Sequence, residues 1–481
     1  MYLKDFAYQG LLRYFERISE IPRPTYHEEK IAQYICDFAS ERGLEYYRDE
    51  ANNVFVKLPA TKGREDEPAI LLQGHTDMVC EKNEDTEHDF FRDGLSLYEE
   101  NGFLRARGTT LGADNGDAVA IMLYILDGAE GHIPSHPPIE CLFTASEEVG
   151  LDGAKSFDYS KVSARRMINL DSADESLIIA GCAGGARTSL SYSPACEGAF
   201  GEALTVSIKG LAGGHSGEDI DKGRANANKL MGRVLLKLYR KFDIRVASIN
   251  GGSKDNAIPR ECQAVITTDN AEAVVREIDV LAKQLAQNLV SEDAGFTLFC
   301  EKTELPKTVM DKASSFKVIF LLDAVQDGIF EMNRSIRGLV EFSRNIGIVK
   351  TDEDTMQIKF LFLSRSPEQH QIDASIEQLT AFADMLGMEV QSGNFYPGWS
   401  YSESSYIRDI YSEAYRELYG KDIVVTTIHA GLECGIIKEK IPDMDIISCG
   451  PVVLDLHSPD EAMDIASFER LFTIMKKVLT K

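Results

Sequence analysis

The sequence predicts an α/β protein with a mostly parallel sheet covered by helices on both faces, interrupted by an inserted α+β domain. Its 481 residues exceed what one ordinary hydrophobic core accommodates, which predicts two domains. In the first 180 residues, short apolar runs alternate with helical segments, the pattern of a buried parallel sheet. After about residue 187, apolar and polar positions alternate along the runs, which is typical of half-exposed strands.

The composition narrows the possible partners. Hydrophobic residues make up 44% and charged residues 27%, as in soluble globular proteins, and the formal net charge is −26. Because no basic surplus can neutralise phosphates, we expect neither a nucleic-acid partner nor binding to an anionic membrane. No apolar stretch approaches the length of a membrane span. The nine cysteines include no CxxC pair, which predicts reduced thiols in a cytoplasmic protein.

The first domain is expected to combine helices with buried strands. Helical spacing of apolar residues is found over 5–20 and 27–43, and residues 117–129 are apolar on nearly every face, as in a buried helix. Apolar runs that end in polar residues predict buried strands at 52–59, 69–79, 139–150 and 164–172. Ligands of such sheets gather beyond the carboxyl ends of the strands, which is where these polar residues lie.

The inserted α+β domain is expected over 187–395, with two similar halves. The elements predicted for the first half are strands at 204–210, 243–251 and 262–269 and helices at 226–240 and near 271–290. Those predicted for the second half are strands at 316–326, 346–351 and 356–366 and a helix around Arg334. The pattern therefore predicts a separate body with its own sheet and helices.

The chain is expected to return to the first domain near Tyr396. A helix is predicted over 405–420, and buried-strand character resumes at 424–437 and 444–459. Residues 1–186 and 396–481 would then form one discontinuous domain.

The motif GHTDMV places two polar side chains at the end of a predicted strand. Residues two apart on a strand face the same side, so His75 and Asp77 point together. A metal-bound imidazole needs its other ring nitrogen held, which a carboxylate does well, so His75 is a candidate ligand and Asp77 its orienting partner. Taken alone, the pair is also explained as polar residues at a strand end.

Three further segments carry carboxylates after strands or turns. The glycine-rich turn around Asp114 could place this carboxylate in a cleft, where its two oxygens could bridge two ions, although taken alone the turn is better explained by an Asp that caps the following helix. Glu147 and Glu148 are adjacent and point to different sides, so one can bind metal while the other acts as a general base; an exposed acidic loop is the simpler alternative. Asp171 directly follows another buried strand.

One more candidate, His457, follows a strand late in the sequence, where a packed histidine is the commoner case. No single element decides, but two histidines and three carboxylates each end a buried strand or its turn. Mixed nitrogen and oxygen donors suit zinc, with manganese or cobalt as substitutes. If Asp114 is shared, each of two divalent metal ions has three protein donors and room for water.

The order of the motifs GHTDMV, LGADNG, EEVG, NLDS and LHSP resembles the M20 family of metallopeptidases. Within that family, the long insertion and the motifs DNAIP, SRS and HAGLECG are similar to the aminoacyl-histidine dipeptidases, also called Xaa-His or carnosinase-like dipeptidases. The resemblance spans nearly the whole chain. It implies a di-metal catalytic domain and an inserted lid and dimerisation domain.

The resemblance assigns roles to the candidate residues. By this likeness, one ion is held by His75 and Asp171 and the other by Glu148 and His457, and Asp114 bridges the two. In the same way, the family likeness makes Asp77 the residue that orients His75 and Glu147 the general base. A cis peptide bond between Asp114 and Asn115 is also implied.

The resemblance extends to the insertion and the late HAGLECG motif. His215, in GLAGGHSGEDI, would stabilise the transition-state oxyanion. Asn256 and Arg365 would bind the substrate's carboxylate, although Arg365 lies far downstream of its usual place and is equally explained as a surface charge on a sheet. Glu433 would meet the substrate's amine, unless it is a buried carboxylate that caps the next helix.

The implied activity is hydrolysis of a small peptide substrate, a dipeptide of the Xaa-His (β-Ala-His) type among the candidates, by metal-activated water in a homodimeric enzyme. An N-acyl amino acid deacylase on the same scaffold would use the same metals and base. A non-catalytic metal- or peptide-binding protein of this fold would lack the base or a ligand, and neither is missing. A metal-independent serine hydrolase is disfavoured because no GxSxG motif occurs.

Overall fold

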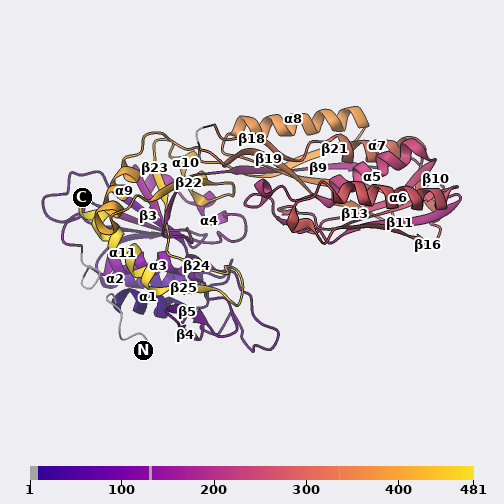
Figure 1. Ribbon diagram of the computed structural model, residues 1–481. Coiled ribbons are helices and arrows are strands. Elements are labelled where there is room, and N and C mark those ends of the chain that lie inside the picture. Colours follow the sequence, from indigo (N-terminus) through magenta and orange to yellow (C-terminus); the bar gives the residue numbers. More distant parts are fainter. Residues whose placement is uncertain (1–8, 129–132, 335) are drawn as a thin grey trace. The chain divides into compact units, whose positions relative to one another are not determined.

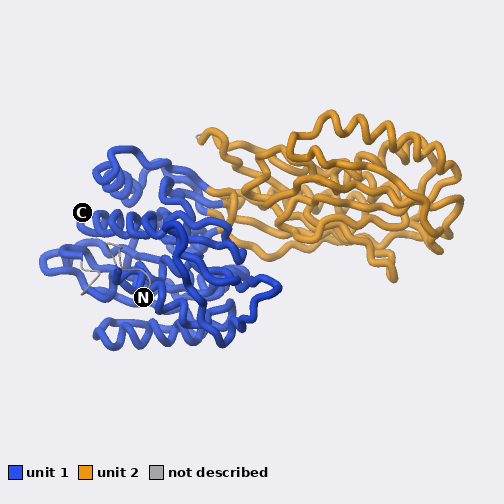
Figure 2. The backbone as a smooth tube through the Cα atoms, turned by 60° about the horizontal axis from the view of Figure 1, so that its bottom comes forward, with its two compact units in different colours: residues 1–182, 399–427, 432–481 blue, residues 183–398, 428–431 orange. Residues whose placement is uncertain are grey.

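The computed structural model describes residues 9–128, 133–334 and 336–481, and the chain divides into two compact units (Figures 1 and 2). Unit 1 contains residues 1–182, 399–427 and 432–481, and unit 2 contains residues 183–398 and 428–431. Unit 1 is thus discontinuous in sequence. The short segment 428–431 belongs to unit 2 although its neighbours on both sides belong to unit 1, and no sequence pattern marks it.

An eight-stranded mixed sheet forms the centre of unit 1, in the order β1-β2-β6-β3-β7-β23-β8-β22. Its four central strands are parallel: β6 (Ile139–Thr144), β3 (Ile70–His75), β7 (Arg166–Asn169) and β23 (Asp445–Ser448). The flanking strands are β1 (Glu45–Arg48), β2 (Val54–Leu58), β8 (Leu177–Cys182) and β22 (Val424–Ile428). The pairs β1–β2, β2–β6 and β8–β23 are antiparallel. The predicted mostly parallel sheet is therefore confirmed at its centre, and antiparallel strands are added on either side.

Helices cover both faces of this sheet, as predicted. One face shares a hydrophobic core with five helices: α1 (Gln9–Ser19), α2 (Glu29–Glu41), α3 (Ala113–Asp127), α9 (Tyr406–Tyr419) and α11 (Ile465–Thr480). Val54 and Val56 of β2 point into that core, so Phe55 points to the other face, where its ring lies 5.8 Å from that of Phe157. Phe157 directly follows α4 (Asp152–Ser156), which packs against α10 (Glu433–Lys440).

The helix predicted over 5–20 corresponds to α1, and residues 5–8 lie outside the described residues. The buried helix predicted over 117–129 corresponds to α3, whose residues from Asn115 to Leu126 are all buried. No helix in the described parts of the chain is long and apolar enough to cross a membrane.

A second, four-stranded sheet in unit 1 has the order β24-β25-β5-β4. Its strands are β4 (Leu97–Glu100), β5 (Phe103–Ala106), β24 (Val453–Leu454) and β25 (Ala462–Asp464). β24 and β25 form an antiparallel hairpin whose loop, 455–461, contains His457. This small sheet fixes both ends of that loop.

Unit 2 is built on one nine-stranded sheet in which all described strand pairs are antiparallel. Its strands are β9 (Gly184–Tyr192), β11 (Glu202–Lys209), β13 (Ile244–Gly251), β15 (Cys262–Thr268), β16 (Thr297–Thr303), β18 (Gly328–Met332), β19 (Val340–Thr351), β20 (Ile358–Ser366) and β21 (Glu389–Tyr396). The two halves expected from the sequence share this sheet, because β13 pairs directly with β19.

Four helices of unit 2 pack into a core with this sheet (Figure 1). They are α5 (Ala227–Lys241), α6 (Ala271–Ala286), α7 (Lys312–Ala324) and α8 (Gln369–Leu386). Leu204, Val206 and Ile208 of β11 contribute to this core, which follows the two-residue period of a strand with one covered face.

Two predicted elements of the second half of the insertion are wrong. The apolar run 316–326, expected as a strand, lies mostly in helix α7, which begins after Asp311, whose side chain accepts a hydrogen bond from the Ser314 N–H at 2.7 Å. A buried helix and a buried strand are both apolar on every side, so the run alone did not distinguish them. Arg334, expected within a helix, follows strand β18 in a bend.

The run 424–437, expected as a buried strand, contains two elements. Strand β22 ends at Ile428, and helix α10 begins at Glu433. The unit 2 segment 428–431 comprises the last residue of β22 and most of the turn before α10.

Candidate functional site

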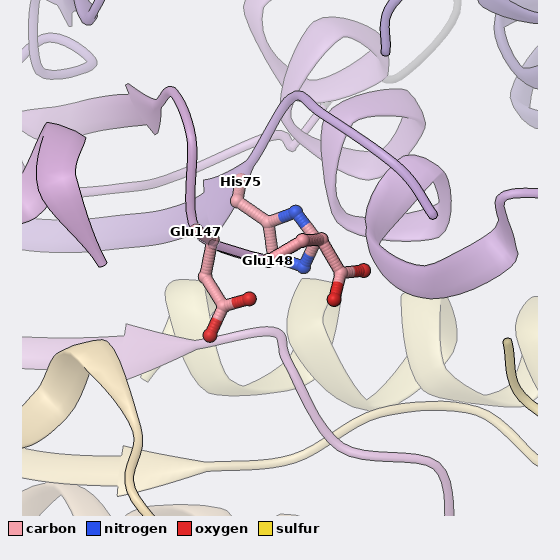
Figure 3. A group of neighbouring side chains, drawn as sticks. All are labelled: His75, Glu147 and Glu148. Carbon is pink, nitrogen blue, oxygen red and sulfur yellow. The ribbon is translucent and has the colours of Figure 1, made fainter. Parts of the chain in front are cut away.

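Two neighbouring parallel strands of unit 1 end side by side and bring the first candidate residues together. His75, the last residue of β3, pairs in register with Thr144, the last residue of β6. The turn after β6 carries Glu147 and Glu148, whose side chains diverge from adjacent backbone positions beside the His75 ring (Figure 3). The parallel register thus explains why residues more than 70 positions apart share one site.

Asp114 lies between the two candidate histidines. It occupies the non-helical start of α3, after Gly112, which has a φ of +64°, and the Asp114–Asn115 peptide bond is cis, as the family resemblance implied. Asp114 Oδ1 is 3.0 Å from His75 Nε2, and Oδ2 is 3.2 Å from His457 Nε2. The two carboxylate oxygens therefore face different histidines, which is the geometry that a ligand shared by two ions requires.

The remaining two candidates complete one group on each side of Asp114. Asp171 Oδ1 is 3.7 Å from His75 Nε2, and Glu148 Oε2 is 3.3 Å from His457 Nε2. Ligand atoms within 4.8 Å of one another form three groups that could hold a metal ion: His75, Asp114 and Asp171; Asp114, Glu148 and His457; and His75, Glu147 and Glu148. The structure thus brings together the five residues singled out as ligands.

The donors of these groups fit divalent cations. They are imidazole nitrogens and carboxylate oxygens, the combination that zinc accepts readily. Glu148 Oε1 is buried and has no hydrogen-bond partner among the described residues, although an unpartnered buried carboxylate oxygen is costly. A cation between these side chains would satisfy this oxygen and offset the repulsion among the carboxylates.

The crowded charges shift the pKa values of the site. Burial raises the pKa of Asp171 to about 8, and nearby Asp114 adds to the shift although His75 opposes it. Burial also holds the pKa of Glu147 well above its usual range. Hydrogen bonds to Asp114 and Glu148 raise the pKa of His457 to about 10. Cation binding would have to displace the proton from that imidazole.

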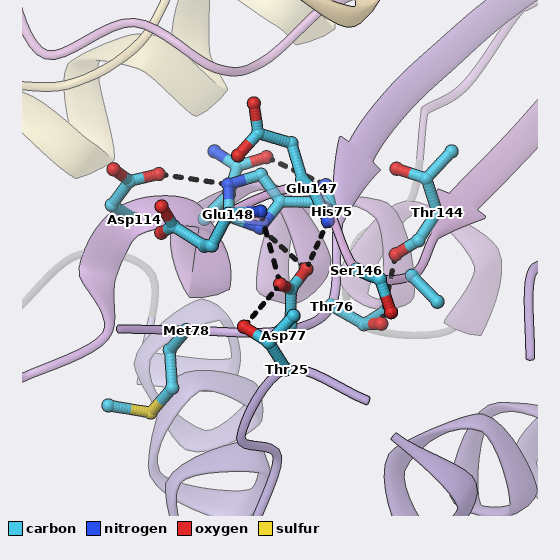
Figure 4. Close-up of polar contacts among 12 residues, drawn as sticks. Thr25, His75, Thr76, Asp77, Met78, Asp114, Thr144, Ser146, Glu147 and Glu148 are labelled. Atoms are coloured by element: carbon cyan, nitrogen blue, oxygen red, sulfur yellow. Dashed lines mark hydrogen bonds and ion pairs between the residues drawn. The ribbon is translucent and has the colours of Figure 1, made fainter. Parts of the chain in front are cut away.

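Asp77 connects His75 to the turn that carries the two glutamates (Figure 4). Its Oδ1 lies 3.3 Å from His75 Nδ1, as expected for the orienting carboxylate. The same side chain accepts hydrogen bonds from the N–H groups of Glu147 at 3.0 Å and Glu148 at 3.2 Å. Asp77 therefore positions the acidic turn as well as the imidazole, a second contact that the spacing of the motif did not predict.

Residues near the start of the chain form hydrogen bonds with the segments that follow β3 and β6, and these residues were not predicted from the sequence. Arg23, 2% exposed, donates hydrogen bonds to the carbonyl oxygens of Thr76 and Asp77, both at 3.1 Å. Thr25 donates to Asp77 Oδ2 at 2.9 Å. Glu28 accepts from the N–H and the hydroxyl of Ser146, both at 2.8 Å. These contacts join distant parts of the chain, so no local motif marks them.

Unit 2 contains a separate group of polar side chains around His215. The short strands β12 (Gly214–His215) and β14 (Ala257–Ile258) pair with each other, so Asn256 lies beside the His215 segment, and its carbonyl accepts a hydrogen bond from the Ser216 N–H at 2.8 Å. Asp219 Oδ2 accepts a hydrogen bond from the His215 N–H at 2.7 Å. Hydrogen bonds to Asn256 and Asp219 thus fix the backbone of the segment that carries the half-buried His215.

Arg365 is buried next to His215, so it is not the exposed sheet charge that the sequence also allowed. It is 5% exposed, donates a hydrogen bond from Nη1 to the Tyr396 hydroxyl at 2.9 Å and places Nη2 at 3.3 Å from His215 Nε2. Its Nε is buried without a hydrogen-bond partner among the described residues. We call His215, Arg365, Tyr396 and His429 the histidine–arginine cluster.

His429 belongs to this cluster because it lies close enough to Arg365 and His215 for both to lower its pKa. Burial has the largest effect, followed by Arg365 and then His215, and together they lower the pKa of His429 to about 3. Its Nε2 lies 2.7 Å from the Ser343 hydroxyl. Burial and Arg365 also lower the pKa of His215. A guanidinium beside two neutral imidazoles and a phenol suits an anionic group such as a carboxylate. Sequence reasoning missed Tyr396 and His429, although His429 opens the HAGLECG motif.

Glu433 is fully buried in unit 1 and does not act as the helix cap that the sequence allowed. It accepts hydrogen bonds from Gln73 Nε2 at 2.5 Å and from the Thr144 hydroxyl at 2.7 Å. Burial raises its pKa to about 7. Its other oxygen has no hydrogen-bond partner in the described part of the chain. Glu433 therefore packs against the carboxyl ends of β3 and β6.

Comparisons with known proteins agree with these motifs. A profile of the Peptidase family M20/M25/M40 matches residues 71–481. The chain is 35% identical over 481 residues to the cytosol non-specific dipeptidase of Escherichia coli (strain K12), which covers 99% of this chain and 98% of the relative.

Two crystal structures show the same fold. That of aminoacylhistidine dipeptidase from Vibrio alginolyticus matches with a TM-score of 0.90 at 35% identity, over 99% of this chain and 97% of that one. That of aminopeptidase PepT from Bacillus cereus ATCC 10987 matches with a TM-score of 0.56 at 15% identity, over 98% of both chains. All five candidate metal ligands lie inside the range matched by the profile, and the chain belongs to the Peptidase family M20/M25/M40.

Proposed function

We propose that this chain is a dipeptidase that uses two divalent cations, with zinc as the best fit and manganese or cobalt as substitutes. The observation that carries the proposal is the position of Asp114, whose two oxygens face His75 and His457 separately. His75 and Asp171 would hold one cation, Glu148 and His457 the other, and Asp114 both. The 35% identity to relatives named as dipeptidases over nearly the full length supports the substrate class.

When bound, the cations would polarise the scissile carbonyl and make the attacking water more acidic. Glu147 takes the proton from this water and returns it to the leaving amine. Its burial supports this role, since a carboxyl with a raised pKa can exchange a proton near neutral pH. Asp77 keeps the His75 imidazole oriented and the turn of Glu147 in place.

The histidine–arginine cluster of unit 2 is proposed to recognise anionic parts of the substrate. Arg365, with its unpartnered Nε, is suited to the terminal carboxylate, and Asn256 is assigned the same partner. His215 is assigned to the developing oxyanion, a contact typically worth about 2.7–4 kcal/mol. For Glu433, contact with the substrate's amine stays a proposal, supported by its unpartnered oxygen.

Xaa-His dipeptides, the name-giving substrates of the Vibrio alginolyticus relative, are the first candidates, and broader dipeptides follow from the name of the Escherichia coli relative. A cytoplasmic location and a homodimer complete the proposal.

The decisive experiment replaces Glu147 with Gln in protein stripped of metal and reloaded with Zn²⁺. We expect kcat for β-Ala-His to fall by about 10²–10⁴-fold, because the general base is lost while every proposed metal ligand remains. Metal content measured in parallel should be unchanged. Undiminished hydrolysis would remove Glu147 from its role.

A matched pair of substrates separates the dipeptidase from an N-acyl amino acid deacylase. We expect the free dipeptide to be hydrolysed much faster than its N-acetylated counterpart. The opposite order would favour the deacylase, and absence of turnover for both in metal-loaded protein would favour a binding protein.

A further inference from the structure

Glu461 is a buried carboxylate that the proposed mechanism does not use. It is 2% exposed and ends the hairpin loop 455–461, directly before β25. It follows His457 by four positions, so the same loop carries a proposed metal ligand and this carboxylate. Neither its burial nor its contacts are explained by the packing of an apolar core.

Four consecutive backbone N–H groups point at this carboxylate. Glu461 Oε2 accepts from Leu111 at 2.8 Å and Gly112 at 2.9 Å. Glu461 Oε1 accepts from Ala113 at 2.8 Å and, more weakly, from Asp114 at 3.4 Å. Successive N–H groups that converge on one anion form a concave binding site of a kind usually occupied by a ligand. Here a side chain of the same protein occupies it.

Arg23 holds the same loop from its other side. Its Nη2 donates a hydrogen bond to the Gly112 carbonyl at 2.6 Å, while the Gly112 N–H is bound by Glu461. The approach is close, because a Cβ atom at Gly112 would lie 2.7 Å from Arg23 Nη2. Both polar groups of residue 112 are therefore bound to buried charged side chains of opposite sign, and charge-assisted bonds are about twice as strong as neutral ones.

We propose that Glu461, together with Arg23, is a positioning residue that fixes the Leu111–Asp114 loop so that the two oxygens of Asp114 face both metal positions. The inference rests on the proposed metal site. Glu461 lies in the same loop as His457. Its hydrogen bonds to residues 111–114 therefore fix the position of Asp114, the shared ligand, relative to His457, a ligand of one ion. Partners of metal ligands typically change metal affinity by about 10–100-fold when they are replaced.

The test compares Glu461→Gln with a matched variant in the same unit. Glutamine keeps the size of the side chain but presents an NH₂ group to two of the four N–H donors. Glu140→Gln is the control, because Glu140 is 3% exposed and accepts backbone N–H bonds from Ser163 and Ala164 at 3.1 Å, at the opposite end of β6 from the metal site. Zn²⁺ affinity of the metal-free proteins is measured by competition with a chromogenic chelator, and thermal unfolding is recorded without metal.

We expect Glu461→Gln to weaken Zn²⁺ binding by about 10–100-fold and Glu140→Gln to leave it within about twofold of the wild type, even if both lower the melting temperature. Wild-type affinity in Glu461→Gln, or equal losses in both variants, would overturn the inference. If Glu461→Gln does not fold, Glu461→Asp takes its place, since it keeps the charge but withdraws the carboxylate by one methylene. We expect Glu461→Asp to bind Zn²⁺ more weakly than the wild type, by less than about tenfold. A Zn²⁺ affinity equal to that of the wild type would overturn the inference.

Hydrolysis of β-Ala-His by the wild type is measured separately. If the wild type binds Zn²⁺ and Glu461→Gln weakens that binding, the positioning role stands even where no dipeptide is hydrolysed, and only the proposed function fails. A wild-type protein that binds no Zn²⁺ would overturn both.

Discussion

At the scale of single residues, Arg365 offers the sharpest test of substrate recognition. It is buried, bound to Tyr396 and adjacent to His215. We expect Arg365→Met to raise KM for a dipeptide by about 10–100-fold, because a hydrogen bond to a charged group is worth about 1.5–3 kcal/mol. The same variant should lose the preference of the wild type for a dipeptide over its C-terminal amide.

Arg344→Met provides the control for that variant. Arg344 is also fully buried in unit 2, but it donates hydrogen bonds to the Gln326 carbonyl and to Ser375. This control should reduce stability without changing the preference for the free carboxylate. If Arg365→Met still distinguishes the dipeptide from its amide, Arg365 is not the carboxylate-binding residue.

His429 leads to a prediction about stability and pH. In the folded chain its pKa falls from 6.5 to about 3, so between these values the unfolded chain binds a proton that the folded chain does not. Stability is therefore lost as the pH falls below 6.5, by about 1.4 kcal/mol per pH unit, and the effect is absent above 6.5.

Denaturant unfolding of metal-free protein at pH 7.5 and pH 5.0 checks this effect. The wild type should lose roughly 2 kcal/mol more than His429→Gln between the two pH values, because only the histidine titrates. His370→Gln, at a histidine whose side chain is 78% exposed, should behave like the wild type. Equal losses in the wild type and His429→Gln would contradict the prediction.

Some functional residues of this chain can be predicted from the sequence and others cannot. The five proposed metal ligands could be named in advance because each follows a strand or turn in a recognisable motif, and the structure places them together. Arg23, His429 and Glu461 could not, because their importance lies in contacts with atoms more than 80 positions away. Such contacts depend on how the strands are ordered in the sheet, and a linear pattern does not carry that order.

At the scale of elements, a bulge in β19 lies against the segment that carries Asn256. The register of β19 against β20 shifts between Ile346 and Ile348, and a Cβ atom at Gly347, between them, would lie 2.5 Å from the Asp255 carbonyl oxygen. We expect Gly347→Ala to cost about 1–3 kcal/mol and to raise KM, because the displaced segment pairs with the His215 strand.

Gly198→Ala is the matched control for Gly347→Ala. Gly198 lies exposed on β10 (Cys196–Gly198) in the same unit, and no described atom lies within 4 Å of a Cβ atom built there. Its melting temperature and KM should match those of the wild type. If both glycine variants gave the same KM, the bulge would have no influence on the segment that carries Asn256.

Helices and strands could be predicted from the sequence where the spacing of apolar residues and the polar residues at the ends of the run indicated the same element. Helix α3 and strands β3, β6 and β7 fit their predicted ranges because apolar runs and polar ends coincide there. The run 316–326 misled because most of its residues are apolar, as in a buried strand, although only some of them, Val318 and Ile319 among these, are buried in α7. The capping residue Asp311 was the local signal that favoured a helix.

At the scale of the whole molecule, metal removal should affect the two units differently. Each unit has its own hydrophobic core, and all proposed metal ligands lie in unit 1. Calorimetry of metal-free protein should show two transitions. Zn²⁺ at 100 times its Kd should stabilise one of them by about 2.7 kcal/mol and leave the other in place. A single transition, or a shift of both, would contradict this expectation.

The discontinuity of unit 1 has a consequence for synthesis on the ribosome. Strand β23 lies between β7 and β8 in the middle of the unit 1 sheet, yet it is translated after the whole of unit 2, which ends at residue 431. Because domains generally fold as units during translation, the second body can mature while the first still lacks a central strand. Until residues 445–448 have been made, the edges of β7 and β8 that pair with β23 therefore lack that partner strand.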